Sequence, residues 1–480
     1  MPDEGSKKTI ASGGKRRMTI GKPALFLGQI GIIHLLIVYH ALSHDADKAD
    51  VESKPNGKNV VVQDVGEQAN IPKQLTAKSK AVQAKLKAQK EDAVARGDVL
   101  TPGAMRASAF YEEEGQILAD LDHGWSGQTT LDPWLNKKAN YYLKRGRVAV
   151  GAVTIIDVKT GDVLALTDHF DETNPATTYV NRAGPKNIAL RKIAPSASLF
   201  KLVSGAALLD HGLDKTRTYP YSYAKRKVTG RHLEKPDSNA DRHTLADALS
   251  KSNNGWFAWV TNKRLTRDIF AKTVDKFWFN KVVPFPILTD ASSAQVPRNR
   301  LERARMSAGF GNTEMTTLHA AVMTAAIATD GRLPTPRLVS KLHGPKGEII
   351  ESPARQPLGR AMKDSTARAL RRMLTRTIVQ GTARKAFKKW PKKLAHIRVG
   401  GKTGTLARRR NGNYIGYTWF VAYAPANNPE IAMAVMVGNS EKWWQRAVDI
   451  GRDILAAHFR RKPRRAVTAK RRDPNTRTTR

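Results

Sequence analysis

The chain has 480 residues, of which 82 are lysine or arginine and 42 are aspartate or glutamate, so its formal net charge is +40 at neutral pH. Apolar residues make up 40% of the sequence, which is enough for at least one large core and excludes a wholly disordered chain. The absence of cysteine excludes disulfides, thiolate metal sites, a cysteine nucleophile and lipidation of an N-terminal cysteine, while the excess of positive charge favours anionic partners.

An uncharged segment near the N-terminus predicts a membrane anchor. Residues 23–42 carry no formal charge, and as a helix they span about 30 Å, the thickness of a bilayer core. Basic residues dominate residues 1–22 and acidic ones follow the segment, so the positive-inside rule leaves residues 1–22 in the cytoplasm and exports the rest. Export also argues against nucleic acid as the partner. A signal peptide cleaved near residues 41–43 and a buried soluble helix are the alternative interpretations.

Two polar segments flank the predicted folded region, residues 128–459. Residues 43–127 are expected to be an extracytoplasmic spacer, because the charges of residues 44–100 nearly cancel, with ten basic and nine acidic side chains, and the apolar stripe is thin. Residues 460–480 hold ten basic residues and one acidic residue, which predicts a disordered basic tail. The folded region between them is itself basic.

The folded region begins and ends with predicted hairpins. Residues 148–156 and 162–167 are rich in β-branched side chains and flank a turn signal at 157–161. Residues 417–424 and 431–437 form a second pair around a proline-bounded turn.

Between the hairpins the pattern is mainly helical. The segment from Leu202 to Leu209 is apolar nearly all round, which predicts a buried helix. Asp364 is a plausible N-cap for an amphipathic helix that reaches Ile378, and a last helix covers residues 447–455. The order predicts an α/β (α+β) fold, with an antiparallel sheet closed by strands from both ends of the region, helices on both faces and an all-helical subdomain.

Three short motifs carry reactive side chains. They are Ser-Leu-Phe-Lys at 198–201, Ser-Asn-Asn at 252–254 and Lys-Thr-Gly-Thr at 402–405. Ser198 and Lys201 lie at the start of the buried helix and on one face of it. Burial would lower the pKa of Lys201, so that its neutral amine could take the proton of Ser198. The alternative is a solvated first turn whose lysine extends into water.

The segments around these motifs resemble the transpeptidase domain of penicillin-binding proteins, over residues 128–452. Seven segments stand in the order and spacing of that family, which is far more specific than any triplet. Besides SLFK they are GQTTLDPWLNKKA (127–139), GAVTIIDVKTGDVLAL (151–166), TLADALSKSNNGWF (244–257), GFGNTEMTTLHAAVMTAAIATDGRLPTPRLV (309–339), VQGTARKAF (379–387) and GGKTGT (400–405).

The resemblance implies catalytic roles for five residues. Ser198 would be the acylated nucleophile and Lys201 its base. Ser252 would pass a proton to the leaving amine, and Asn254 would hold Lys201 and the substrate's amide. Lys402 would favour a neutral Lys201 and attract the terminal carboxylate of the substrate.

The resemblance also implies a substrate-binding strand at Thr403, Gly404 and Thr405. The hydroxyl groups of Thr403 and Thr405 would bind the substrate carboxylate. The backbone N–H groups of Ser198 and Thr405 would form an oxyanion hole.

The activity that the resemblance implies is that of a membrane-anchored peptidoglycan D,D-transpeptidase, which cross-links stem peptides and is inhibited by β-lactams. No metal or cofactor is expected, since no pair of histidines has the spacing of metal ligands. Hydrolysis by a class A β-lactamase needs an added glutamate. Glu302 and Glu314 are the acidic candidates, and both are interpreted as surface ion pairs.

Two other functions stay open. One is a D,D-carboxypeptidase or a weak serine β-lactamase. The other is a binding or sensor module for β-lactams or anionic envelope polymers, which would use the basic surface and tail. Residues 44–127 are too short for the glycosyltransferase domain of bifunctional relatives, so a separate glycosyltransferase is a candidate partner.

Overall fold

The computed structural model describes part of the chain. The described residues are 110–121, 125–174, 177, 187–224, 227–352, 355–410, 413–440 and 444–461. The anchor predicted at 23–42 and the tail beyond Arg461 lie outside them. Within these ranges, no helix combines the length and the apolar character needed to cross a bilayer.

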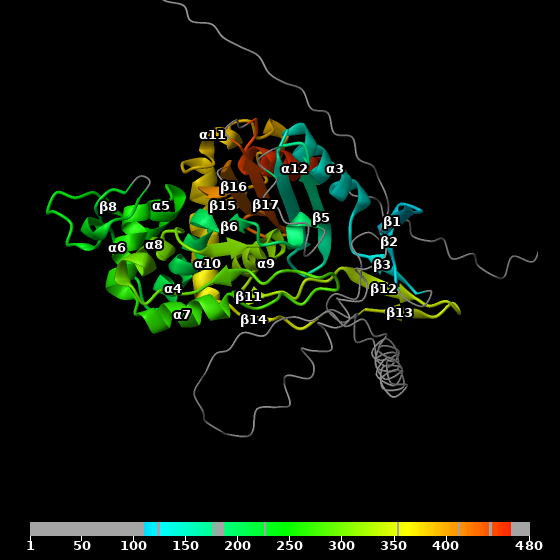
Figure 1. Cartoon of the computed structure of the whole chain (residues 1–480), viewed down its shortest axis with the longest axis horizontal. Helices are drawn as coiled ribbons and strands as arrows, with labels where there is room; N and C mark the ends of the chain where they lie inside the picture. The colour runs from blue at the N-terminus through cyan, green and yellow to red at the C-terminus, as the bar shows by residue number, and fades with distance from the viewer. Residues whose placement is uncertain are drawn as a thin grey trace, which may run out of the picture. The chain divides into compact units, whose positions relative to one another are not determined.

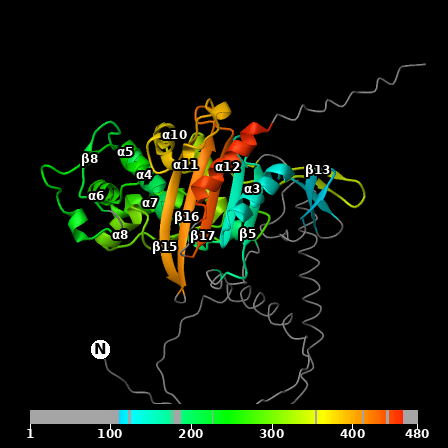
Figure 2. The same cartoon turned by 90° about the horizontal axis from the view of Figure 1, so that it is seen from above.

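A five-stranded antiparallel sheet forms the centre of the fold (Figures 1 and 2). Its strand order is β15-β16-β17-β4-β5, so the early hairpin pairs with the late one where β17 meets β4. The strands are β4 (Val150–Asp157), β5 (Val163–Phe170), β15 (Gly400–Arg410), β16 (Asn413–Ala424) and β17 (Ile431–Asn439). Both predicted hairpins and the closure of the sheet by sequence-distant strands are confirmed.

Each face of this sheet has its own apolar core, because successive side chains of a strand point to opposite faces. Ala152 and Met436 belong to the core that contains helix α9 (Thr317–Ala328). Val153 and Val435 belong to the core that contains α3 (Pro133–Arg145) and α12 (Ala447–Arg460). Helices on both faces explain why β17 is buried along its whole length.

The remaining helices gather mainly beside β15, in green and yellow in Figure 1. They are α4 (Phe200–Asp210), α5 (Leu245–Ser250), α6 (Asn254–Arg264), α7 (Arg267–Lys276), α8 (Arg300–Ser307), α10 (Asp364–Val379) and α11 (Arg384–Phe387). Among the described residues, short strands form three small sheets. In the first, β10 (Thr313–Met315) lies between β6 (Ala194–Pro195) and β9 (Ser293–Ala294). In the other two, β7 (Tyr219–Pro220) pairs with β8 (Arg242–His243), and β11 (Arg332–Leu333) pairs with β14 (Gly359–Arg360).

Asp364 does not cap α10, as the sequence analysis expected. Lys363 takes the N-cap position, and Asp364 is the first residue of the helix, where its carboxylate pairs with Arg368. An acidic side chain is also favourable there, since the first turn of a helix carries partial positive charge.

A second five-stranded sheet has no counterpart in the sequence analysis. Its order is β1-β2-β3-β12-β13, and its strands are β1 (Phe110–Glu113), β2 (Gln116–Asp120), β3 (Ser126–Thr129), β12 (Val339–His343) and β13 (Ile349–Glu351). The expectation of a spacer over 43–127 therefore does not hold for its last part. The strands are short and half exposed, and the partner of β3 lies about two hundred residues further along the chain, so local patterning could not indicate them.

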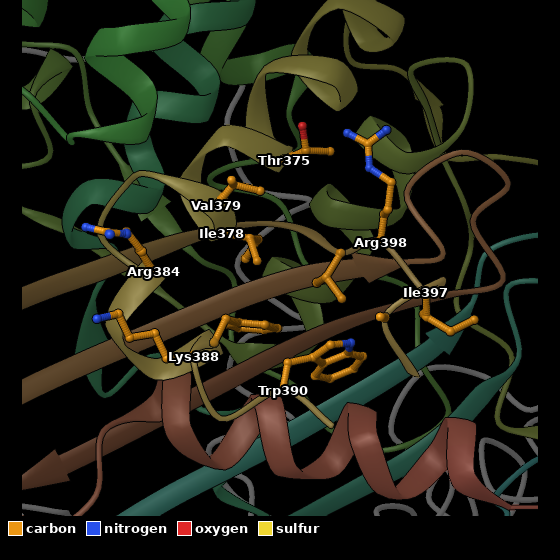
Figure 3. Close-up of a pocket in the computed structure, with 11 residues that line it drawn as sticks. Thr375, Ile378, Val379, Arg384, Lys388, Trp390, Ile397 and Arg398 are labelled. Atoms are coloured by element: carbon orange, nitrogen blue, oxygen red, sulfur yellow. The ribbon is translucent and has the colours of Figure 1, made fainter. Parts of the chain in front are cut away.

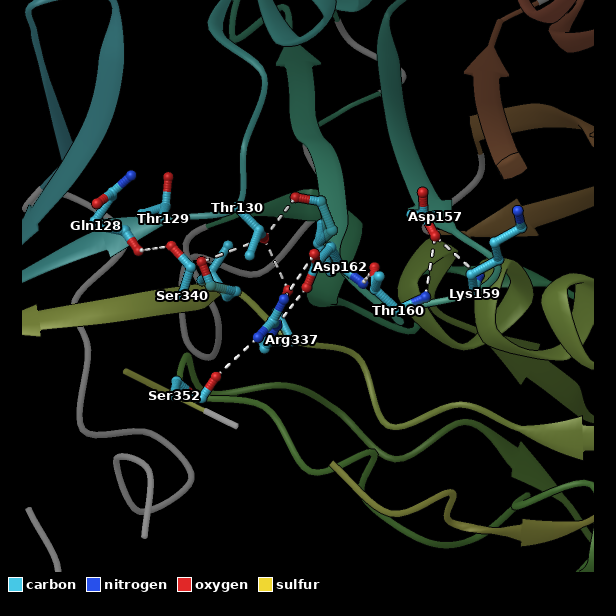
Figure 4. A network of polar contacts seen from close by, with 12 residues as sticks. Gln128, Thr129, Thr130, Asp157, Lys159, Thr160, Asp162, Arg337, Ser340 and Ser352 are labelled. Carbon is cyan, nitrogen blue, oxygen red and sulfur yellow. Dashed lines mark hydrogen bonds and ion pairs between the residues drawn. The ribbon is translucent and has the colours of Figure 1, made fainter. Parts of the chain in front are cut away.

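An arginine–aspartate pair ties the two sheets together (Figure 4). Arg337, just before β12, donates to both carboxylate oxygens of Asp162, just before β5, with Nη2 2.8 Å from Oδ2. Arg337 Nη1 also donates to the carbonyl of Ser352 at 2.8 Å, and the hydroxyl of Thr130 donates to the carbonyls of Val163 and Arg337. Both charged side chains are only 18% exposed.

We expect the variant Asp162→Ala to lower the free energy of unfolding by about 1–3 kcal/mol, because it leaves the guanidinium of Arg337 largely buried without its carboxylate. Urea denaturation measures the change. The control is Asp330→Ala: Asp330 pairs with Arg332 and Arg360 but is 44% exposed. Its loss should cost less than about 0.5 kcal/mol. Equal losses in the two variants would contradict a special role for the buried pair.

Candidate active site

Ser198 lies in a tight turn that leads into a buried helix. The turn is the 3-10 helix η4 (Ala197–Leu199), and α4 begins at the next residue. Ala197 has a φ of +47°, which is uncommon for a residue other than glycine. Trp419 Nε1 donates to the carbonyl of Pro195 at 2.8 Å and holds the chain ahead of the turn against the central sheet. Ser198 thus stands at the amino end of α4, where N–H groups and the helix dipole favour negative charge.

Lys201, one turn further on, is buried with no exposed surface. Its Nζ lies 2.8 Å from Ser198 Oγ, 2.8 Å from Asn254 Oδ1 and 2.6 Å from the carbonyl oxygen of Ala308. Burial, and then the charge of Lys402, lower the pKa of Lys201 well below its ordinary value.

The three partners of Lys201 suit a neutral amine. A neutral amine has two N–H groups and one lone pair, whereas an ammonium has three N–H groups and no acceptor. Asn254 Oδ1 and the carbonyl of Ala308 can only accept, so they use the two N–H groups. The lone pair is then left for Ser198, whose hydroxyl can donate to it. This arrangement lets Lys201 withdraw the proton from Ser198.

A second lysine is buried in the same site. Lys402 on β15 has no exposed surface, and its Nζ donates to Ser252 Oγ at 3.0 Å and to the carbonyl of Thr403 at 2.9 Å. Burial lowers the pKa of Lys402 to about 7. Ser252 itself has a φ of +55°, so the loop that presents its hydroxyl is in an unfavourable backbone conformation.

Helix caps hold the loop of Ser252 on both sides. Asn253 is the N-cap of α6 and accepts a hydrogen bond from the N–H of Trp256 at 3.0 Å. Ahead of the loop, Asp247 of α5 completes a capping box with Thr244 and accepts a hydrogen bond from Arg376 of α10 at 2.8 Å. These caps aim Asn254, the first residue of α6, at Lys201.

A turn after α10 connects this loop to β15. The N–H of Thr382 donates to the carbonyl of Ser250 at 3.0 Å, and Thr382 Oγ1 lies 2.5 Å from Thr403 Oγ1. A Cβ on Gly381 would lie 2.3 Å from the oxygen of Ser250, so only glycine allows this approach. Thr382 was not among the predicted site residues, although its segment was noted as a family turn. A contact between hydroxyl groups of two separate elements leaves no local pattern.

The open edge of β15 runs past the turn that carries Ser198. β15 is the edge strand of the central sheet and packs against η4. A Cβ on Gly404 would lie 3.4 Å from the Cβ of Ala197, while Thr405 is exposed on the same strand. The structure therefore joins Lys201 with Ser198 and Asn254, and Lys402 with Ser252, and it places residues 403–405 on the adjoining edge.

The two glutamates considered as water-activating bases are both ion-paired. Glu302 lies 2.5 Å from Arg305 on α8 and is 46% exposed, as expected for a surface pair. Glu314 lies 2.6 Å from Arg408 of β15 and is 21% exposed, so this pair is more buried than the sequence analysis expected. Both carboxylates are therefore engaged by arginine side chains.

Ser198 is hydrogen-bonded to the buried Lys201, and a second hydrogen-bonded serine–lysine pair lies beside it, next to an antiparallel sheet flanked by helices. This arrangement defines an acyltransferase of the active-site-serine class. The family model of the penicillin binding protein transpeptidase domain matches residues 151–456, well over half of the chain. The chain belongs to this family.

Known relatives match a similar part of the chain. Peptidoglycan D,D-transpeptidase PbpA of Mycobacterium tuberculosis is 24% identical over 392 residues, which cover 73% of this chain and 76% of that protein. Probable peptidoglycan D,D-transpeptidase PenA of Neisseria flavescens is 26% identical over 326 residues, which cover 65% of this chain and 73% of that protein. Stage V sporulation protein D of Bacillus subtilis is 24% identical, and the match spans about half of its length (48%).

Solved structures show the same fold. The crystal structure of PBPA from M. tuberculosis has a TM-score of 0.58 and 23% identity, and the match covers 70% of this chain and 83% of that one. The ceftriaxone acyl-enzyme complex of penicillin-binding protein A from M. tuberculosis has a TM-score of 0.56 and 25% identity, with 70% and 80% covered.

We expect Gly309→Ala to slow covalent labelling of Ser198 by a fluorescent penicillin at least about tenfold, because displacement of a reacting group is costly. Gly309 has a φ of +92°, and an added Cβ would lie 2.2 Å from the oxygen of Ala197 and 2.9 Å from the nitrogen of Ser198. Gly311→Ala is the matched control: its φ is +89°, but no atom lies within 4 Å of the added Cβ. If the labelling rate falls equally in both variants, the cause is backbone strain at a positive φ, and the predicted displacement of Ser198 is wrong.

The rate constant of acylation should follow a bell-shaped pH profile. As the pH falls, Lys201 should gain a proton and lose the lone pair that would accept the proton of Ser198, so acylation should slow. As the pH rises through about 7, Lys402 loses the charge that would hold a substrate carboxylate, so acylation slows again. Labelling rates between about pH 5 and pH 10 measure the profile. Lys402→Arg, whose charge persists at high pH, should remove the alkaline fall. A profile without a maximum would contradict these assignments.

Proposed function

We propose that the chain is a peptidoglycan D,D-transpeptidase that cross-links stem peptides through an acyl-enzyme at Ser198, and that β-lactams acylate the same serine. The observation that carries the proposal is the buried amine of Lys201, whose two N–H groups are used by carbonyl oxygens and whose third contact is Ser198 Oγ at 2.8 Å. The names of the relatives support the substrate class.

In the acylation step, Ser198 Oγ attacks the carbonyl carbon of the D-alanyl–D-alanine bond while Lys201 takes its proton. The backbone N–H groups of Ser198 and Thr405 stabilise the oxyanion. The C–N bond then breaks, and the leaving amine receives a proton from Lys201 through the hydroxyl of Ser252. An ester of Ser198 and free D-alanine are the products.

In the second step an amine of another stem peptide attacks the ester. Lys201 takes the proton of that amine and returns one to Ser198, and a new amide bond forms. Attack by water would give hydrolysis instead. The ion pairs of Glu302 and Glu314 argue against hydrolysis of the class A β-lactamase kind, since such an enzyme adds a glutamate that activates water.

The donor peptide is proposed to lie along β15. An edge strand offers unpaired N–H and C=O groups to an extended peptide. Lys402 and the hydroxyl groups of Thr403 and Thr405 would hold the terminal carboxylate. The short contact between Thr403 and Thr382 would fix the first of these hydroxyl groups.

The position of the enzyme in the cell is also part of the proposal. The uncharged segment 23–42 and the basic residues ahead of it support a single anchor in the cytoplasmic membrane, with the catalytic domain outside the cytoplasm. There a separate glycosyltransferase would supply glycan chains, and the basic surface and tail would contact anionic envelope polymers.

The decisive test is intact-mass measurement after incubation with penicillin. Wild type should gain one penicilloyl adduct, and Ser198→Ala should gain none, because the acylated oxygen is absent. Lys201→Ala should remain folded by circular dichroism but acylate about 10²- to 10⁴-fold more slowly, the usual contribution of a general base. An adduct on Ser198→Ala would mean that the nucleophile is another residue.

Product analysis separates the proposed activity from its alternatives. A D-alanyl–D-alanine pentapeptide is supplied with and without a second D-amino acid as acceptor, and the products are identified by mass. The transpeptidase should form the exchanged peptide. Release of D-alanine by hydrolysis alone would indicate a carboxypeptidase, and acylation by penicillin without peptide turnover would indicate a sensor.

A further inference from the structure

A groove of about 430 Å³ lies between the end of α10, helix α11 and the segment that enters β15 (Figure 3). Its lining is separate from the catalytic residues. Ile378, Phe387, Trp390 and Val399 provide an apolar floor. Two of its walls continue into the active site: α10 leads to the turn of Thr382, and Val399 precedes the first residue of β15.

The aromatic floor of this groove is held in place by the fold. The rings of Phe387 and Trp390 lie 5.5 Å apart, and Phe387 also lies 5.8 Å from Phe420 of the central sheet. Trp390 Nε1 donates to the carbonyl of Leu394 at 2.9 Å. These contacts leave the recess open without any rearrangement of its side chains, which lowers the cost of filling it.

Three cationic side chains surround the apolar floor. Arg384 of α11 and Lys388, the residue after that helix, lie on one side, and Arg398 lies across from them (Figure 3). None of the three forms an ion pair with any residue that the structure describes. The sequence has no aspartate or glutamate between residues 365 and 429. On the adjoining helix α12, Asp449 and Asp453 are already paired with Arg452.

We propose that this groove binds an acidic peptide segment of a partner protein, with one apolar or aromatic side chain in the recess and carboxylates on the three cations. A concave floor lined by Phe387 and Trp390 accepts a single side chain, and buried aromatic residues with arginine at their edge are typical of the energetic centre of a protein interface. The three cations would favour acidic partners over others and would increase the rate of association. The proposal does not depend on the catalytic activity.

Selection from a random dodecapeptide library displayed on phage tests the proposal, with the full chain as the target. We expect enriched peptides to combine several acidic residues with an apolar or aromatic residue. Fluorescence anisotropy of these synthetic peptides should show binding at least about tenfold weaker to the variant Arg384→Glu/Lys388→Glu/Arg398→Glu. The three substitutions replace positive charges that attract the peptide carboxylates with negative charges that repel them. Added salt should weaken binding to wild type.

A charge-matched control separates the groove from the general basicity of the chain. Lys215→Glu/Lys235→Glu/Lys276→Glu makes the same change in net charge at exposed positions elsewhere. This control should bind the peptides within about twofold of wild type. Both variants should keep the wild-type rate of labelling by penicillin, which shows that they are folded.

Several results would overturn the proposal. They are a selection that enriches no peptide, enriched peptides without acidic residues, and equal binding to the groove variant and to wild type. Vesicles containing phosphatidylglycerol provide a further comparison. If the groove variant loses binding to these vesicles while no acidic peptide competes with them, the groove is a lipid site.

Discussion

Two lysine side chains without any exposed surface, Lys201 and Lys402, lie close enough for the charge of one to lower the pKa of the other, and the rest of the site depends on this interaction. Two buried ammonium ions would cost far more than the surrounding hydrogen bonds return. The conflict is relieved when Lys201 stays neutral, because Asn254 and Ala308 accept its two N–H groups and Ser198 faces its lone pair. The same burial and neighbouring charge that lower the pKa of Lys201 suit it to the proposed role of base for Ser198.

This arrangement has a cost in stability. A lysine with a lowered pKa binds fewer protons in the folded chain than in the unfolded chain, between its folded pKa and its ordinary value of 10.5. In that range the free energy of unfolding rises with pH, so at neutral pH both amines oppose folding. The two apolar cores on the faces of the central sheet offset this cost.

The relative positions of the reactive side chains are fixed mainly by backbone contacts between the segments that carry them. Gly309 lies against the turn of Ser198, and Gly381 lies against the helix that precedes Ser252. Thr382 then links that helix to β15. These contacts bring together three short segments that are far apart in the sequence. The turn of Thr382 and strand β15 also adjoin the basic groove, so the candidate active site and the proposed docking site share structural elements.

Local patterns in the sequence were sufficient for many features of the fold. Both hairpins, the buried helix after Ser198 and the amphipathic helix ending near Ile378 follow from periodicity over a few residues, and the spacing of Ser198 and Lys201 placed them on one face. The resemblance to the family added the prediction that the residues around Ser252 and Lys402 belong to the same site. The N-cap of α10 was displaced by one residue, because Asp364 is favourable on either side of a helix start.

The local elements and the reactive residue types could be predicted from sequence, since they depend on neighbours one to four positions apart. Three features required the folded chain: residues 110–120 join a sheet with residues 339–351, Thr382 contacts Thr403, and the basic segment after α10 surrounds an aromatic recess. Strand pairing and side-chain packing join positions far apart in the chain, and their free energy depends on partners that no local pattern contains.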